Sequence, residues 1–170
     1  GQIIKPLFKT GDRVTPRLPK LVQTLLDPKI YPDKPERVEL VQTQMSFVFL
    51  TGDYVYKIKK PVNLGYLDYT TLGKRHFYCQ REVELNQRLC PEIYLGVVPI
   101  VCRVMNITLG GKGKFIVYAV KMRQFPFGAT LDSIDERGKL ATVQIDQLAA
   151  RLAHFHLAEC ARASADSLWG

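Results

Sequence analysis

The chain has 170 residues, of which 46% are hydrophobic and 24% are charged, as in a soluble globular protein that buries a core without disulfides or a metal. Its longest uninterrupted apolar stretch, residues 95–102, contains a glycine and a proline and is far shorter than the roughly 20 residues that span a bilayer. The first residues show no apolar segment of the secretory type, so we set membrane and secreted proteins aside and expect a cytoplasmic protein.

The net charge of +8 is unevenly distributed along the chain. Residues 1–125 carry 20 basic and 10 acidic side chains, whereas residues 126–170 carry 4 basic and 6 acidic ones. A basic region of this size predicts an anionic partner, which is either nucleic acid or a small phosphorylated ligand. The charge alone does not separate these two classes.

Prolines interrupt the first 35 residues repeatedly, so this region is predicted to be an arm followed by one short helix at residues 18–26, which Pro28 ends. From residue 36 the pattern changes to strands. Runs rich in β-branched and aromatic residues, separated by short polar links or turns, predict three strands at residues 38–41, 46–50 and 54–59.

A link at residues 62–69 leads into a long helix that begins at Thr70 or Thr71, both good N-caps. Two more strands are predicted on either side of a glycine-rich turn, at residues 95–104 and 114–122. The rest is helical, most strongly over residues 142–161, where apolar side chains recur at helical spacing.

This order predicts an α+β fold in which a five-stranded antiparallel sheet has one long helix inserted between its third and fourth strands. We expect three regions: an N-terminal arm and short helix at 1–35, the sheet and its helix at 36–124, and further helices at 125–170. The four cysteines have no C-x-x-C spacing and lie in apolar stretches, which favours reduced thiols.

The third predicted strand carries lysines on an inward face. Side chains alternate across a strand, so Val55, Lys57 and Lys59 share one face. A lysine that points inward is desolvated at high cost unless it meets an anion. Helical spacing places Glu82 on the apolar face of the long helix, whereas Glu84 points about 200° away, at ~100° per residue. We therefore expect Glu82 to pair with Lys57, with Glu84 as the alternative if the helix is rotated.

An inward strand lysine paired with a helix glutamate, with two strands after the helix, resembles the small lobe of a protein-kinase-like enzyme. Residues 118–126 (YAVKMRQFP) resemble the fifth strand and the hinge to the large lobe. Residues 128–131 (GATL) and 147–156 (QLAARLAHFH) resemble the first turn and first long helix of that lobe. The predicted fold class is thus a kinase-like small lobe followed by the first helices of the large lobe.

Within this superfamily the chain most resembles the aminoglycoside-phosphotransferase-like branch, and in particular an uncharacterised bacterial group. The stretches that carry the resemblance are VFLTG at 48–52, YKIKKPV at 56–62, LDYTTL at 67–72 and YLGVVPI at 94–100. The resemblance covers about residues 18–160.

The resemblance implies a nucleotide-binding lobe for phosphoryl transfer from ATP or GTP, with Mg²⁺, to a hydroxyl group. Lys57 then contacts the phosphates and Glu82 holds Lys57. The loop between the first two strands covers the phosphates with Thr43, Gln44 and Ser46, although it lacks the glycines of protein kinases. The backbone of Val120, Lys121 and Met122 faces the adenine.

Two motifs of the family are not found in the chain: the His-x-Asp catalytic loop with its downstream Asn, and the metal-binding Asp that follows. We therefore expect no catalytic residue and no metal ligand here, and whether the chain is itself an enzyme stays open. The expected partners are the nucleotide, the missing C-terminal lobe and a second copy bound through the C-terminal helix, with no membrane.

Two other functions stay open. The first is a basic module that binds nucleic acid, which is disfavoured because the basic residues are scattered and no recognition motif accompanies them. The second is a catalytically dead kinase-like scaffold that holds a protein partner.

Overall fold

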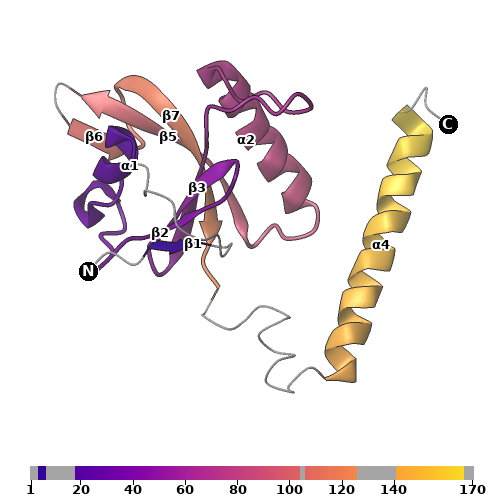
Figure 1. Cartoon of the computed structure of the whole chain (residues 1–170). Helices are drawn as coiled ribbons and strands as arrows, with labels where there is room; N and C mark the ends of the chain where they lie inside the picture. Colours follow the sequence, from indigo (N-terminus) through magenta and orange to yellow (C-terminus); the bar gives the residue numbers. More distant parts are fainter. Residues whose placement is uncertain (1–3, 7–17, 104–105, 126–140, 167–170) are drawn as a thin grey trace. The chain divides into compact units, whose positions relative to one another are not determined.

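The computed structural model describes residues 4–6, 18–103, 106–125 and 141–166 (Figure 1). They belong to two compact units, Gly1–Gln124 and Phe125–Gly170. Among the described residues, the first unit contains a curled sheet and two α-helices, and the second contains the long helix α4 (Thr142–Asp166). The first unit carries all the predicted site residues.

Seven strands form one sheet in the order β1-β2-β3-β4-β7-β5-β6. β1 pairs with β2 in parallel, and all other neighbours are antiparallel. The last described strand along the chain, β7, therefore lies inside the sheet, between β4 and β5. The bounds are β1 (Ile4–Pro6), β2 (Glu39–Gln42), β3 (Ser46–Leu50), β4 (Tyr54–Lys59), β5 (Tyr94–Arg103), β6 (Asn106–Leu109) and β7 (Lys114–Arg123).

The helices of the first unit are α1 (Lys20–Thr24) and α2 (Leu72–Gln87), with a 3₁₀ turn at Pro28–Ile30. Thr71 caps α2, because its hydroxyl accepts a hydrogen bond from the backbone N–H of Lys74 at 3.2 Å. The Asp68 carboxylate further stabilises the N-terminus of α2. It accepts hydrogen bonds from the backbone N–H and the hydroxyl of Thr70 and from the Lys74 ammonium. α2 thus begins at a fixed point on the chain that follows β4.

The sheet has a core on each face. The face that α1 covers holds the main core, and the Tyr31 hydroxyl closes the segment after α1 by donating to the carbonyl of Leu25 at 2.6 Å. α2 packs on β7 and β5 on the other face, where Cys79 and Val83 meet Val120. The main core consists of Val22, Leu25, Tyr31, Leu40, Phe49, Tyr56, Ile58, Ile100, Val117 and Ala119.

The structure confirms the α+β class and corrects the strand count. The prediction of five strands missed β1 and β6. β6 is a four-residue strand that begins with Asn106 and lies between the two strands predicted at 95–104 and 114–122, while β1 lies in the region predicted as an arm. The short helix predicted at residues 18–26 is present as α1, and Val22, Leu25 and Tyr31 belong to the main core of the sheet.

The second unit is described through α4 alone. Its side chains Val143, Ile145, Leu148, Leu152 and Leu157 are exposed. Association of two copies through this helix stays a prediction. Within the described ranges, none of the helices combines the length and the apolar character needed to cross a membrane.

Two glycines of the first unit predict opposite effects of an added methyl group. A Cβ at Gly113 would lie 2.8 Å from the carbonyl oxygen of Cys102, which belongs to strand β5 and cannot move freely. A Cβ at Gly73, in the first turn of α2, meets nothing within 4 Å. We expect Gly113→Ala to lower the free energy of unfolding by about 1–3 kcal/mol and Gly73→Ala to raise it by about 0.5 kcal/mol. Urea unfolding of both variants checks this, and similar effects would contradict it.

Candidate anion-binding site

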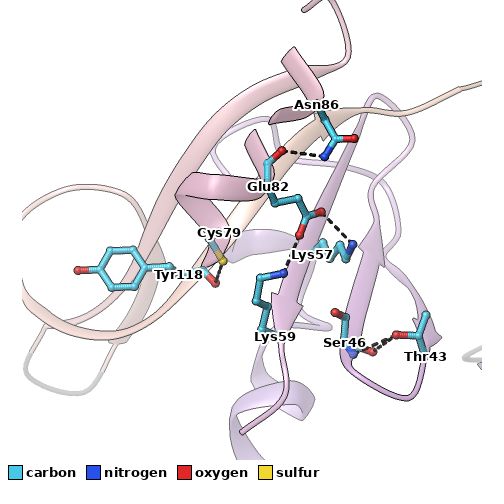
Figure 2. Close-up of polar contacts among 8 residues, drawn as sticks. All are labelled: Thr43, Ser46, Lys57, Lys59, Cys79, Glu82, Asn86 and Tyr118. Carbon is cyan, nitrogen blue, oxygen red and sulfur yellow. Dashed lines mark hydrogen bonds and ion pairs between the residues drawn. The ribbon is translucent and has the colours of Figure 1, made fainter. Parts of the chain in front are cut away.

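Two lysines of β4 and one glutamate of α2 form a cluster of ion pairs (Figure 2). Lys57 Nζ lies 2.9 Å from Glu82 Oε1, and Lys59 Nζ lies 2.6 Å from Glu82 Oε2. Each carboxylate oxygen therefore accepts a hydrogen bond from a different lysine. The side chains are 30% exposed for Lys57, 6% for Lys59 and 14% for Glu82. The expected pair of Lys57 and Glu82 is present, and Lys59 shares its carboxylate.

Local structure explains why these three side chains meet. Tyr56 and Ile58 point into the main core, so Lys57 and Lys59, which alternate with them along β4, point to the face that carries α2. Glu82 precedes Val83 on the inward side of α2, and Asn86, one turn later, donates from its amide to the Glu82 carbonyl at 2.8 Å.

The alternative partner, Glu84, is exposed and pairs with Arg81 at 2.6 Å. The helix phase expected from the sequence is therefore correct for Glu82.

The electrostatics of the cluster keep Glu82 and Lys59 charged. Burial acts to raise the pKa of Glu82, but hydrogen bonds from Lys59 and then Lys57 outweigh it and hold that pKa below its usual value. Burial acts to lower the pKa of Lys59, but the hydrogen bond and charge of Glu82 reverse this and raise it. With two ammonium groups for one carboxylate, the three side chains carry a net positive charge, which attracts an anion.

Neutral side chains surround the buried end of the cluster. The ring of Tyr69 lies under Lys59, with its centroid 4.9 Å from Nζ. Burial, with a smaller contribution from Glu82, raises the pKa of Tyr94. Burial likewise raises the pKa of the Cys79 thiol to about 11. These groups are uncharged at neutral pH, so they leave the charge of the cluster unchanged.

A half-buried apolar surface adjoins Lys57 on the same face of the sheet. Directly paired residues of neighbouring strands share a face. One row across β2, β3, β4 and β7 reads Val41, Val48, Lys57 and Val120, and the next reads Glu39, Leu50, Val55 and Met122, with Glu39 on β2 two strands away from Val55. All of these except Val120 are half-buried. The row on the other side of Lys57 consists of Ser46 and Lys59, and both residues are buried. The accessible side of Lys57 is therefore bordered by apolar side chains.

The turn between β2 and β3, predicted to cover phosphates, is closed by its own hydrogen bonds. Thr43 N–H donates to the Ser46 carbonyl at 3.0 Å, and Ser46 N–H donates to the Thr43 hydroxyl at 3.0 Å. The Lys60 ammonium also donates to the Thr43 carbonyl at 2.7 Å. Ser46 is buried and Thr43 is half-buried, so Gln44 is the one exposed residue of the predicted trio. A contact of this turn with phosphates stays a prediction.

Val120, Lys121 and Met122, the predicted adenine-facing segment, lie inside β7. Their backbone is paired with β4 on one side and β5 on the other. Met122 faces the side of Lys57, whereas the Lys121 ammonium lies 3.8 Å from the ring centroid of Tyr54 on the opposite face. Met122 is thus the side chain of this segment that can contact a ligand near Lys57. Adenine binding by the backbone of residues 120–122 stays a prediction.

Sequence reasoning missed Lys59 as a member of the site. The alternation of β4 places Lys59 beside Lys57, so the signal was present. Lys59 and Lys60 are neighbours at the end of the strand, and this crowding indicates that one of them is solvated. In the structure Lys60 is half-buried and its ammonium lies 4.6 Å from the Phe47 ring centroid, while Lys59 is buried on the other face. Tyr69, under Lys59, also had no assigned role.

The part of the chain that the structure describes contains no group of three or more His, Cys, Asp or Glu side chains that could hold a metal ion. Cys79, Cys90 and Cys102 are free thiols, as predicted. Cys160 lies outside the residues whose side chains are described.

The chain is similar to curated mycobacterial proteins. It is 32% identical over 119 residues to the uncharacterised proteins Rv2004c and MT2060 of two Mycobacterium tuberculosis strains and Mb2027c of Mycobacterium bovis. The alignment covers 70% of this chain and 22% of each relative, so the chain spans about a fifth of the length of the curated relatives it matches. No protein-family model and no solved structure matches it.

Proposed function

We propose that the first unit is the nucleotide-binding lobe of a small-molecule kinase that resembles aminoglycoside phosphotransferases. One observation carries the proposal: a lysine on the third antiparallel strand, Lys57, pairs at 2.9 Å with a glutamate on the helix that follows. Kinase-like enzymes use a lysine and a glutamate in these positions to hold the phosphates of ATP.

The surroundings of Lys57 support the same ligand class. A phosphate needs a cation, and a nucleobase needs a flat apolar surface beside it. Lys57 is accessible, belongs to a net positive cluster, and borders the half-buried side chains Val48, Val55 and Met122. In this proposal Lys57 contacts the α- and β-phosphates of ATP or GTP, Glu82 fixes Lys57, and the apolar rows contact the base.

The activity of the complete protein is part of the proposal. It is phosphoryl transfer to a hydroxyl group, with Mg²⁺ and the catalytic aspartate held by residues outside those assigned here. Nucleotide binding by this chain is the part that can be tested directly.

Calorimetric titration with Mg·ATP, at low and high salt, tests the proposal. We expect one saturable site whose affinity falls about tenfold or more in Lys57→Ala, because a charge-assisted contact to phosphate is lost. Lys112→Ala is the matched control, since it removes the same charge from an exposed turn. It should bind as the parent chain does.

The absence of saturable binding in the parent chain would overturn the proposal, as would equal affinity in both lysine variants. Weak binding that is the same in all three chains and disappears at high salt would favour the nucleic-acid module instead. A steep salt dependence of affinity for an RNA oligonucleotide would then be expected.

A further inference from the structure

The two lysines that share Glu82 are not equivalent. Lys59 is almost fully buried, its ammonium lies 2.6 Å from Glu82 Oε2, and the Tyr69 ring lies under it. Lys57 is 30% exposed, and its ammonium lies 2.9 Å from Oε1. In Figure 2 the lysines approach the carboxylate from the same strand and end on different oxygens. One lysine is therefore placed to stay with Glu82, and the other is placed to reach a ligand.

The two lysines share the neutralisation of Glu82. A lysine that contacts a carboxylate and a phosphate together divides its N–H donors and its charge between them, and a buried carboxylate that is incompletely neutralised is unfavourable. In this site Glu82 keeps Lys59 when Lys57 also contacts a ligand. The burial of Lys59 also argues against its contacting a ligand itself, since its row neighbour Ser46 is buried too.

We propose that Lys59 is a positioning residue, which holds the Glu82 carboxylate in place so that Lys57, still paired with Glu82, can contact an anionic ligand. That the ligand is a phosphate rests on the proposed function. The different roles of the two lysines do not rest on it. Five groups face or adjoin the carboxylate: Lys57 and Lys59 from β4, Cys79 from α2, Tyr94 from β5, and Tyr69 beyond Lys59.

The first measurement needs no nucleotide. The pKa of Glu82 is followed by the chemical shift of its carboxyl carbon in the full chain, in Lys57→Met and in Lys59→Met. We expect the pKa in Lys59→Met to lie at least about one unit above that in Lys57→Met, because the closer, buried cation has been removed. An equal rise in both variants, or a larger one in Lys57→Met, would overturn the proposal.

The second measurement is a double-mutant cycle on Mg·ATP affinity with Lys59→Met, Glu82→Gln and the double variant. If Lys59 acts through Glu82, Lys59→Met weakens binding about tenfold in the parent chain and has little effect once residue 82 is neutral. An effect of the same size in both backgrounds would mean that the Lys59 charge acts on the anion directly, and would overturn the positioning role.

Two controls separate the possible failures. Lys59→Arg keeps a cation at this position and should restore most of the affinity. If the parent chain binds no Mg·ATP, the proposed function fails, while the titration of Glu82 still decides the role of Lys59. If Lys59→Met does not fold, Lys59→Met combined with Glu82→Gln removes both buried charges, and its Mg·ATP affinity is compared with that of Glu82→Gln alone. Similar affinities support the proposal, and a further tenfold loss contradicts it.

Discussion

Glu82→Gln is expected to destabilise the chain more than any other single charge-removing substitution considered for this site. The amide leaves Lys59 buried beside no carboxylate and Lys57 without its ion pair. Removing one member of a buried ion pair costs about 3–5 kcal/mol, and we expect about 3 kcal/mol here because Lys57 is partly exposed. Urea unfolding at neutral pH measures the loss.

Glu84→Gln provides the matched control for this substitution. It makes the same chemical change two residues away on the same helix, at an exposed ion pair with Arg81. Exposed pairs contribute about 0.2–1 kcal/mol, so this variant should remain close to the parent chain. If Glu82→Gln costs no more than Glu84→Gln, then Glu82 is not the partner of two buried cations in solution.

The sequence predicted the Lys57–Glu82 pair because both periodicities that place it are local. Strand alternation puts Lys57 on the face opposite Tyr56 and Ile58, and helical spacing puts Glu82 on the inward side with Val83. Neither inference needs the position of any distant residue. The same alternation placed Lys59 beside Lys57, but burial at the end of a strand depends on what packs there. Tyr69, ten residues later, packs over Lys59.

Features that depend on distant contacts were not predicted. β1 becomes a strand by adding to the edge of β2, more than thirty residues later in the chain. The β2–β3 turn likewise has a partner from outside its own segment. Lys60, which directly follows β4, donates a hydrogen bond to the Thr43 carbonyl. Local pattern carries no information on such partners. β6, by contrast, pairs with β5 directly before it in the chain, and it escapes the sequence pattern because it has only four residues and begins with Asn106.

The apolar rows beside Lys57 could not be predicted from the sequence either. Val48, Val55 and Met122 come from three strands and meet only through the registers of β3 with β4 and of β4 with β7. Because β7 is inserted between β4 and β5, a residue near the end of the unit lies beside residues from its centre. The ligand class inferred for Lys57 therefore depends on topology as much as on the ion pair.

Acidification is expected to reduce the stability difference between the parent chain and Glu82→Gln. The folded pKa of Glu82 is depressed below its ordinary value of 4.5, so its charge contributes stability above about that pH, and this contribution is lost as the pH falls through the folded pKa. At still lower pH the parent carboxyl is neutral, like the amide. The raised pKa of Lys59 keeps its ammonium charged across this range.

Free energies of unfolding measured between about pH 3 and pH 7 for both chains test this expectation. The difference should be constant near neutrality and shrink progressively below about pH 4.5, as expected when the folded state binds protons less readily than the unfolded state. Asp68, whose pKa is lowered mainly by the hydrogen bond from Lys74, is present in both chains, and its contribution cancels. A difference that stays constant or grows on acidification would show that folding does not lower the pKa of Glu82, and neither the pairing with Lys57 nor the role given to Lys59 would then hold.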